Sequence, residues 1–466
     1  MKVEKKYASL LRSILDRIDY SMIIQAIRGQ GLFLNPWADI DQTVSILNHL
    51  SFTEKEAIKL FFLGIPVSRV DLLNELSDEE IDFLIDAEIL VEKNCILSTN
   101  NLVILMYQQI LVVVDILPQY ETNQNPDTDV YIGIDSLRLA ENIDFKKGAS
   151  VLDICSGSGI QGLLAARSAS KVISVELNPK AAQVARFNAM LNDLDGTIEV
   201  REGNLYSVLN DNEKFDYVYA NPPFIPVDKD TYYPLCGDGG EDGMDILKEI
   251  VAGIPKYTHK DSKVRIFCQC LGSNENMLFY DYLMDISLKE KWTVTNVVSD
   301  KLPLNYQAEQ LTTIASLVNP DLDKDRFMNS MHNIYEKLDV SYLFSLIINV
   351  TVGKGYAFNN IMLANEISLN EKPKAKKDIK VNLSKPVYDV YEEEKLSGHF
   401  DEMAADIFHL LDGDHSVSDI VKILYPKYKE KFNQSLFELE VLNNIYCMQK
   451  IKVLDTEKTF ALQRQI

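Results

Sequence analysis

The residues with the most specific chemical potential are Asn221, Pro222, Pro223 and Phe224, which follow an apolar run. Two consecutive prolines fix the backbone and remove its N–H donors at these positions. The carbonyls of Asn221 and Pro222 can then point into a cleft, where the Asn221 side chain adds another acceptor. Phe224 supplies a flat face for a planar group. This pattern favours a site that holds the N–H bonds of a planar amide or aromatic amine; the alternative is a proline turn that only ends a strand.

A glycine-rich segment lies upstream of this tetrapeptide. Gly157, Gly159 and Gly162 form Gly-x-Gly-x-x-Gly between a predicted strand and a predicted helix, the context in which this pattern binds a nucleoside cofactor. Gly157 permits a tight turn, Gly159 lets a ligand approach the backbone, and Gly162 lets the helix pack on the sheet. Glu176 ends the next predicted strand, where it can accept hydrogen bonds from a ribose diol. A nicotinamide cofactor and S-adenosylmethionine both fit these residues.

Asp153 distinguishes the two cofactors. It ends the first predicted strand, directly before the glycines, where a dinucleotide would place its pyrophosphate. A carboxylate at this point repels phosphate but attracts the ammonium group of S-adenosylmethionine. We therefore expect Asp153 to face the cofactor.

This combination resembles motif I of the class I S-adenosylmethionine-dependent methyltransferases, in which an acid at the position of Glu176 binds the ribose. Where these enzymes place an acid that accepts the adenine amino group, the sequence has Asn204, so the resemblance shifts part of that recognition to the backbone of Leu205. The cofactor contacts implied by the resemblance are Asp153, Ser156, Gly157, Gly159, Glu176, Leu177, Asn204, Leu205 and Asn221.

The tetrapeptide is similar to motif IV of the N-methyltransferase branch of this family, which implies that Asn221, Pro222 and Phe224 are catalytic. Residues 237–244 are similar to the glycine-rich loop of its "small" members, and residues 130–137 to their entry strand. Tyr131, Pro223 and Phe224 would then border the substrate. The resemblance covers about residues 128–305. The nearest families by motif methylate glutamine amides in release factors or exocyclic nitrogens of nucleic-acid bases.

The predicted reaction needs neither a strong base nor a metal. Asn221 and the Pro222 carbonyl would accept the N–H bonds of the acceptor and direct its lone pair toward the sulfonium methyl. As the methyl group arrives, the nitrogen gains positive charge, which carbonyl dipoles stabilise more strongly in the transition state. The protonated product loses its proton readily, and the sequence shows no evident metal-binding cluster.

Length and composition limit the alternatives. The 466 residues indicate two or three domains, and 46% hydrophobic with 25% charged residues is typical of a soluble globular protein. The net charge of −22 disfavours a broad nucleic-acid-binding face. Cys268 and Cys270 are expected to be buried, reduced strand residues. Since we find no signal-peptide core and no apolar run that could span a bilayer, we expect a cytoplasmic protein without a membrane partner.

We predict an α/β fold in which a seven-stranded, Rossmann-like methyltransferase sheet is flanked by mainly helical, winged-helix-like domains. Alternating apolar strands and helical patterns in the middle third indicate the parallel sheet. The N-terminal part has the helix, helix, hairpin order of a winged helix. The expected domains are residues 1–120 (N-terminal), 121–365 (catalytic), a linker at 366–384, and 385–466 (C-terminal).

Three functions remain open from the sequence. The first is an N-methyltransferase acting on a peptide, protein or small peptide-derived metabolite. In support, residues 404–421 resemble the small winged-helix units that bind leader peptides in ribosomal-peptide modification, although a purely structural winged helix fits them too. The second is a nucleic-acid base N-methyltransferase, which the acidic N-terminal helices disfavour. The third is a binding protein that retains an inactive methyltransferase fold. A homodimer is compatible with each.

Overall fold

The computed structural model describes residues 1–28, 44, 47, 54–116, 130–144, 146–228, 233–273, 276–319, 321–362, 372–384, 387–392, 395–429, 432, 434–450 and 454. The chain forms two compact units. The first comprises residues 1–26 and 34–360, and the second comprises residues 27–33 and 361–466. All residues predicted to do chemistry belong to the first unit.

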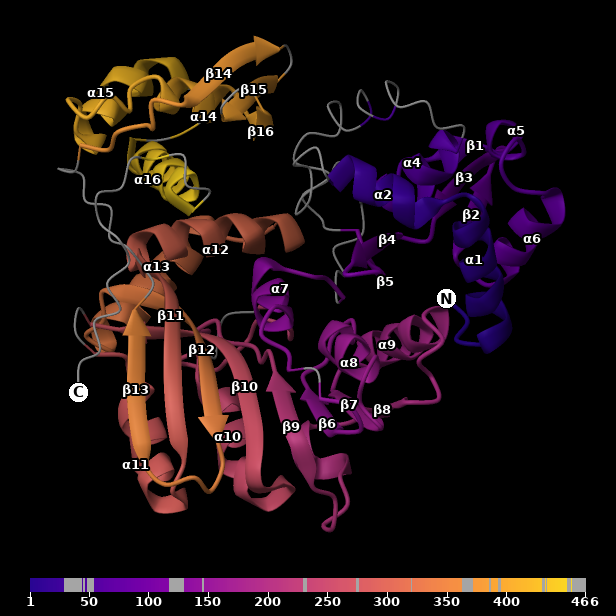
Figure 1. Cartoon of the computed structure of the whole chain (residues 1–466), viewed down its shortest axis with the longest axis horizontal. Coiled ribbons are helices and arrows are strands. Elements are labelled where there is room, and N and C mark those ends of the chain that lie inside the picture. The colour runs from indigo at the N-terminus through magenta and orange to yellow at the C-terminus, as the bar shows by residue number, and fades with distance from the viewer. Residues whose placement is uncertain are drawn as a thin grey trace. The chain divides into compact units, whose positions relative to one another are not determined.

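The N-terminal part of the first unit combines helices with two small antiparallel sheets (Figure 1). The order of α4, α6 and the β2–β3 hairpin matches the predicted helix, helix, hairpin sequence; the short α5 lies between the two helices, and β1 pairs with β3 as a third strand. Helix α6 begins in the capping box formed by Ser77 and Glu80. The winged-helix assignment of this part stays a prediction. Its elements are α1 (Lys5–Arg17), α2 (Tyr20–Arg28), α4 (Lys55–Leu63), β1 (Val67–Ser68), α5 (Arg69–Leu72), α6 (Asp78–Asp86), β2 (Leu90–Lys93), β3 (Ile96–Thr99), β4 (Leu102–Tyr107) and β5 (Ile110–Asp115).

The part of the first unit from α7 to β13, called the catalytic part here after its predicted role, alternates strands and helices, as predicted for a parallel sheet. Its elements are α7 (Ile134–Ala140), β6 (Ser150–Ile154), α8 (Ile160–Ala166), β7 (Lys171–Glu176), α9 (Pro179–Leu191), β8 (Ile198–Glu202), the 3₁₀ helix η1 (Leu205–Val208), β9 (Phe215–Ala220), α10 (Asp245–Tyr257), β10 (Thr258–Gly272), α11 (Tyr280–Glu290), β11 (Thr293–Pro303), α12 (Leu304–Val318), α13 (Lys324–Lys337), β12 (Tyr342–Thr351) and β13 (Ala357–Met362). The strands form one sheet in the order β13-β11-β12-β10-β9-β6-β7-β8. Strands β8, β7, β6, β9 and β10 are parallel, whereas β12 is antiparallel to both β10 and β11.

This α/β, Rossmann-like sheet has eight strands, one more than the seven predicted. The additional strand is β13, which lies beside β11 at the sheet edge. After β12 the chain turns at Gly353 and Gly355, whose positive φ angles of 71° and 104° allow a tight reversal. The short run Ala357–Met362 contains two asparagines, which sequence reasoning associates with turns rather than strands.

The β4–β5 hairpin is attached to the catalytic part by asparagine side chains of α9. Asn188 accepts a hydrogen bond from the Val113 N–H at 2.8 Å and donates to the Val113 carbonyl at 3.1 Å. Asn192, one turn later, makes the same pair of bonds to Leu111, at 2.9 and 2.7 Å. These amides thus take the place of a neighbouring strand along β5. Asn188 also donates to the Ser158 carbonyl at 3.0 Å, in the glycine-rich turn.

The described residues of the second unit form a three-stranded antiparallel sheet and three helices around a core of their own. Its elements are β14 (Ile379–Ser384), β15 (Val387–Glu392), β16 (Lys395–Phe400), α14 (Glu402–Phe408), α15 (Val417–Tyr428) and α16 (Gln434–Lys450). The predicted linker at 366–384 is wrong at its end, because residues 379–384 form β14. Ile379, Val381 and Leu383 alternate with polar residues, and this period of two outweighs the lysines before it.

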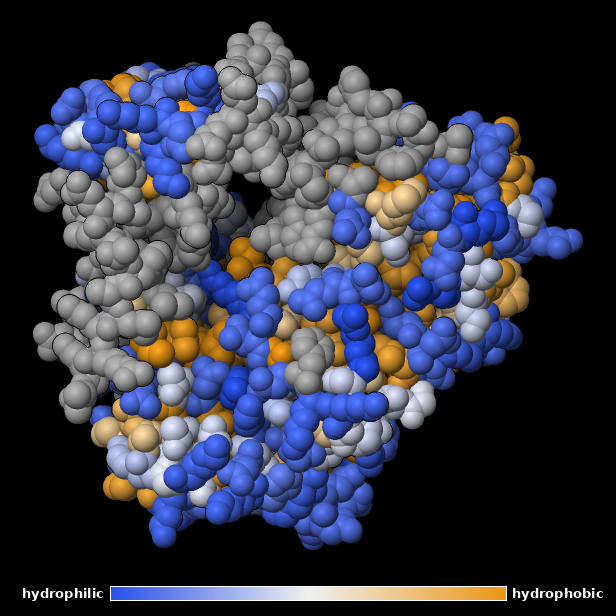
Figure 2. All heavy atoms as spheres, viewed as in Figure 1, coloured by the Kyte–Doolittle hydropathy of each residue, from blue (hydrophilic) through white to orange (hydrophobic). Residues whose placement is uncertain are grey.

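The sheet strands of the first unit are rich in buried apolar side chains, and Cys268 and Cys270 are buried in β10, as predicted. In Figure 2, hydrophilic residues predominate over the lower part of the visible face, where β9 and β10 begin. No helix among the described residues is long and apolar enough to cross a membrane.

Candidate active site

The candidate site is a pocket at the carboxyl ends of β6, β7 and β9. The chain continues from β6 to β7 on one side, while β9 lies on the other, so the pocket occupies the point where the strand order reverses. Open α/β sheets bind ligands at such points. Nearly all the predicted site residues line it: Tyr131, Ser156, Gly157, Glu176, Leu177, Asn204, Leu205, Asn221, Pro222, Pro223 and Phe224. Asp153 and Gly159 are not among its lining residues.

The glycine-rich turn is shaped by backbone conformations that favour glycine. Gly157 and Gly159 have φ angles of 52° and 83°, and Cys155 also adopts a positive φ of 57°. The Gly159 N–H donates to the Ser156 carbonyl at 2.7 Å, which closes the turn. At Gly162 a Cβ atom would lie 2.6 Å from the Ser174 hydroxyl oxygen, so only glycine lets α8 approach the sheet this closely.

Glu176 links the glycine turn to the next strand. Its carboxylate accepts hydrogen bonds from the Gly157 N–H at 2.7 Å and the Asn178 N–H at 2.8 Å. Burial raises the pKa of Glu176, while these two backbone donors oppose the shift. A carboxylate offers about four lone-pair sites, so capacity remains for hydroxyl donors in the pocket.

The position of Asp153 differs from the prediction. Its side chain is only 1% exposed and lies beneath the glycine turn, where it accepts a hydrogen bond from the Gly162 N–H at 2.9 Å. Burial raises the pKa of Asp153 to about 7, and the nearby Glu176 carboxylate adds to this shift. Asp153 therefore supports the turn from below instead of facing a ligand. The prediction was wrong because β6 is buried on both faces, so its hydrophobic pattern does not show which way Asp153 points.

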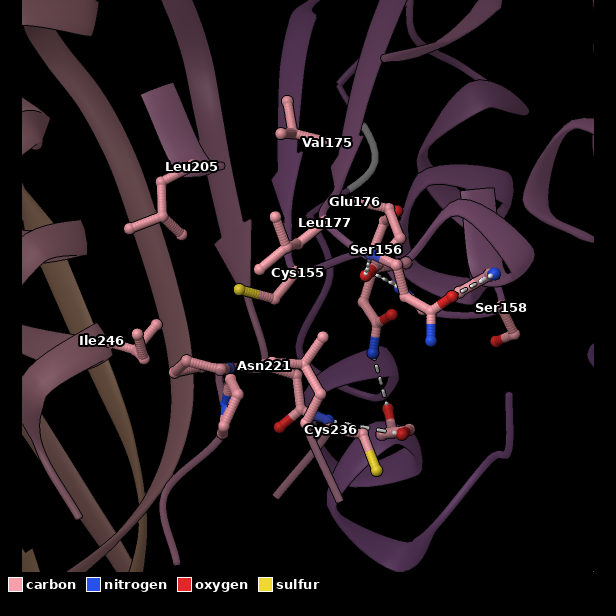
Figure 3. A pocket seen from close by; sticks show the side chains of 18 of the residues that line it. Cys155, Ser156, Ser158, Val175, Glu176, Leu177, Leu205, Asn221, Cys236 and Ile246 are labelled. Atoms are coloured by element: carbon pink, nitrogen blue, oxygen red, sulfur yellow. Dashed lines mark hydrogen bonds between the residues drawn. The ribbon is translucent and has the colours of Figure 1, made fainter. Parts of the chain in front are cut away.

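The wall of the pocket opposite the glycine turn and Glu176 is apolar. Leu205 and Ile246 lie on one side, and Glu176, Ser156 and Ser158 lie on the other (Figure 3). Leu205 has a positive φ of 46°, a strained conformation for a leucine, directly after Asn204. Such a wall suits a flat, weakly polar ring. Sequence reasoning missed Ile246, because its place at the start of α10 follows only from the three-dimensional fold.

The side-chain amide of Asn221 is hydrogen-bonded through its nitrogen, while its oxygen has no partner among the described residues. Its Nδ2 donates to Asp135 Oδ2 at 2.6 Å and to the Ser136 hydroxyl at 3.4 Å. Its Oδ1 is buried and has no hydrogen-bond partner within the described structure. A buried acceptor without a partner is costly, and a ligand N–H would satisfy it. Asp135 and Ser136, on α7, were missed as site residues because more than 80 positions separate them from Asn221.

The loop after the tetrapeptide holds its backbone in place. The Ile225 N–H donates to the Gly237 carbonyl at 2.8 Å, and the Gly239 N–H donates to the Ile225 carbonyl at 2.9 Å. A Cβ on Gly239 would lie 2.8 Å from the Phe224 Cα, so the two segments touch through their backbones. The Phe224 ring packs edge-on against Phe267 of β10, with 5.9 Å between ring centroids. The prolines and the glycine-rich loop together make this wall rigid.

The charge of the pocket suits a cationic ligand. Its described lining residues include the acids Asp135, Glu176 and Asp238 but neither lysine nor arginine. The Ser156 hydroxyl oxygen, like Asn221 Oδ1, is buried without a partner in the described structure. These groups fit S-adenosylmethionine, which carries a sulfonium charge together with several hydrogen-bonding groups. Within the described part of the chain, no three His, Cys, Asp or Glu residues gather in a way that could hold a metal ion.

Comparison with known proteins gives consistent matches to the catalytic part. The family model "methyltransferase small domain" matches residues 132–233. The chain is 34% identical, over 137 residues, to a putative protein N5-glutamine methyltransferase from Methanocaldococcus jannaschii, covering 28% of this chain and 68% of that protein. It is 30% identical to a release factor glutamine methyltransferase from Clostridium acetobutylicum, covering 27% of this chain and 47% of the relative.

Among solved structures, the tRNA m1G37 methyltransferase from M. jannaschii aligns with a TM-score of 0.32 and 14% identity, covering 55% of this chain and 57% of that one. This likeness is too low to carry an argument. The sequence relatives are more informative, because the first of them is matched over two thirds of its length. The chain belongs to the small-domain family of class I S-adenosylmethionine-dependent methyltransferases, in its N-methyltransferase branch.

Proposed function

We propose that this protein transfers a methyl group from S-adenosylmethionine to the side-chain amide nitrogen of a glutamine in a protein. The observation that carries the proposal is the Oδ1 atom of Asn221, a buried acceptor without a partner, beside the rigid Pro222–Phe224 segment. The printed names of two relatives support it, since both describe glutamine methyltransferases.

The residues that would hold the cofactor come from four segments. The backbone at Ser156 and Gly157 would contact the amino-acid part, and the Glu176 carboxylate would accept the ribose hydroxyls. Leu205 and Ile246 would enclose the adenine ring. When bound, the cofactor supplies an electrophilic methyl group, and the acidic pocket favours its cationic sulfonium.

The residues around the methyl acceptor hold its amide in place. They do not activate it with a base. Asn221 Oδ1 and the Pro222 carbonyl oxygen would accept the two N–H bonds of the glutamine amide, and Phe224 would lie against its plane. As the nitrogen forms its bond to the methyl carbon, it gains positive charge, which these carbonyl dipoles stabilise. The N–H proton then passes to water. Positioning of the two reactants contributes the remainder of the acceleration.

A nucleic-acid base is the less favoured acceptor. Phosphate groups next to a target base require lysine or arginine side chains. None occurs among the described residues that line the pocket, and the chain as a whole carries a charge of −22. A glutamine side chain brings no charge into the site, so it fits these surroundings better.

The test is incubation with methyl-labelled cofactor and separate protein, RNA and small-molecule fractions of a cell extract. We expect label in the protein fraction, at a glutamine located by mass spectrometry. Label confined to RNA would refute the proposal. The Asn221→Ala variant should lose turnover and keep its affinity for S-adenosylhomocysteine in calorimetry, because Asn221 acts on the acceptor. A large loss of that affinity would contradict the role given to Asn221.

A further inference from the structure

The bond between Asn221 and Asp135 determines more than the position of a side chain. An asparagine amide can be placed in two orientations that exchange its oxygen and nitrogen, and their shapes are nearly identical. Only one of them presents an acceptor to the pocket. With the NH₂ group turned inward, the site would offer donors to a substrate that also brings donors.

Asp135 distinguishes these two orientations chemically. An ionised carboxylate accepts hydrogen bonds and donates none. At 2.6 Å from Asp135 Oδ2, the neighbouring atom of Asn221 must therefore be the NH₂ nitrogen, because two acceptor oxygens at this distance would repel each other. Ser136 does not discriminate, since its hydroxyl can both donate and accept.

We infer that Asp135 is a positioning residue, whose carboxylate fixes the Asn221 amide so that its carbonyl faces the methyl acceptor. This inference rests on the proposed function, because it assumes that the methyl acceptor is an amide with N–H bonds. It adds a residue that lies 86 positions from Asn221 and outside the tetrapeptide.

The arrangement has a consequence for pH. Burial raises the pKa of Asp135, and hydrogen bonds from Asn221 and the backbone, with the charge of Arg138, oppose this shift. Tyr131, Cys236 and Asp238 line the same pocket. Once protonated, Asp135 can donate to the Asn221 oxygen, so the unproductive orientation becomes accessible. The rate should therefore fall on the acid side at a pH above the ordinary carboxyl range.

The first test measures turnover of Asp135→Ala and Asp135→Asn with a glutamine-containing acceptor protein. Loss of a hydrogen bond to a charged group predicts a kcat about 10- to 100-fold lower for Asp135→Ala, with unchanged affinity for S-adenosylhomocysteine. In Asp135→Asn both orientations are allowed, so kcat should fall by about twofold or more, and the acid limb of the pH profile should disappear. A wild-type kcat in Asp135→Ala, or a retained acid limb in Asp135→Asn, would overturn the inference.

The matched control is Asp144→Asn, which neutralises a carboxylate just after α7 that pairs with Lys263 and Arg265 outside the pocket. It should leave kcat and the acid limb unchanged. Thermal unfolding of all variants identifies any that fail to fold.

A second test needs no acceptor. The side-chain amide signal of Asn221 in ¹⁵N NMR, assigned by its loss in Asn221→Ala, should show one proton protected from solvent exchange in the wild type. Protection should decrease on acidification and be absent in Asp135→Ala. If protection is the same in Asp135→Ala, the inference is wrong. If protection behaves as expected but no protein acceptor is found, the proposed function fails and the orientation by Asp135 stands.

Discussion

Replacing Gly239 with alanine should slow the reaction although Gly239 does not line the pocket. The added Cβ would lie 2.7 Å from the Gly243 carbonyl oxygen and 2.8 Å from the Phe224 Cα. Both are backbone atoms, which cannot rotate away as a side chain can. Because non-bonded carbon atoms settle at about 3.5 Å or more, Phe224 and the loop must separate by about 0.7 Å.

The size of the effect follows from this displacement. A misplacement of about 1 Å costs about 100-fold in rate, so about 0.7 Å predicts a kcat about 20- to 30-fold lower. Overpacking should also destabilise the fold by about 1–3 kcal/mol, which thermal unfolding would detect. Affinity for S-adenosylhomocysteine should change little, because the glycine turn of the cofactor site is not displaced.

The matched control is Gly196→Ala, where an added Cβ meets nothing within 4 Å. Its kcat and unfolding temperature should remain close to those of the wild type. A folded Gly239→Ala protein with wild-type kcat would refute the reasoning, because it would show that the loop does not set the position of Phe224.

Three further changes test other parts of the site. Asp153 has a folded pKa of about 7 against an ordinary value of 3.8, so the stability that its protonated form contributes is present at low pH and is lost as pH rises toward 7. Asp153→Asn should therefore be more stable than the wild type at pH 8 by up to about 4 kcal/mol and gain less at pH 5; equal gains in unfolding free energy at both values would contradict this. Gly159→Ala places a side chain at a φ of 83° and 3.3 Å from the Ala185 Cβ. It should weaken cofactor-analogue binding in calorimetry by about tenfold, since positive φ costs about 1–2 kcal/mol, and unchanged binding would count against the described turn. Asn188→Leu, which removes the bond to the Ser158 carbonyl, should lower the free energy of unfolding by about 2–4 kcal/mol and reduce the same affinity; reduced stability with full affinity would show that the turn does not depend on Asn188.

Much of the fold could be predicted because apolar strands alternate with helical patterns bounded by glycine and polar residues. The glycine turn and Glu176 could also be predicted from the sequence, since strand, turn and helix follow one another within 30 residues. The direction of the Asp153 side chain could not be predicted. A strand buried on both faces has no alternation of apolar and polar residues that would show which face each side chain is on. Strand β13 was missed for a related reason: two asparagines weaken the pattern on an edge strand, where burial is partial.

The partners of Asn221 could not be predicted from the tetrapeptide. Asp135 lies on a short helix before the first catalytic strand, and its approach to Asn221 depends on how α7 packs on β10. Ile246 reaches the pocket only because the chain after Phe224 returns through the glycine loop to α10. Both are long-range contacts, for which sequence spacing gives no signal.

The asparagine pair on α9 means that the β4–β5 hairpin cannot be removed as a separate module. A chain that began at residue 130 would deprive Asn188 of its bonds to Val113, and Asn188 is fully buried. The same side chain supports the Ser158 carbonyl, so truncation would loosen the cofactor turn without altering any residue in it. The conformation of the glycine-rich turn therefore depends in part on the β4–β5 hairpin, which precedes the catalytic part in the chain.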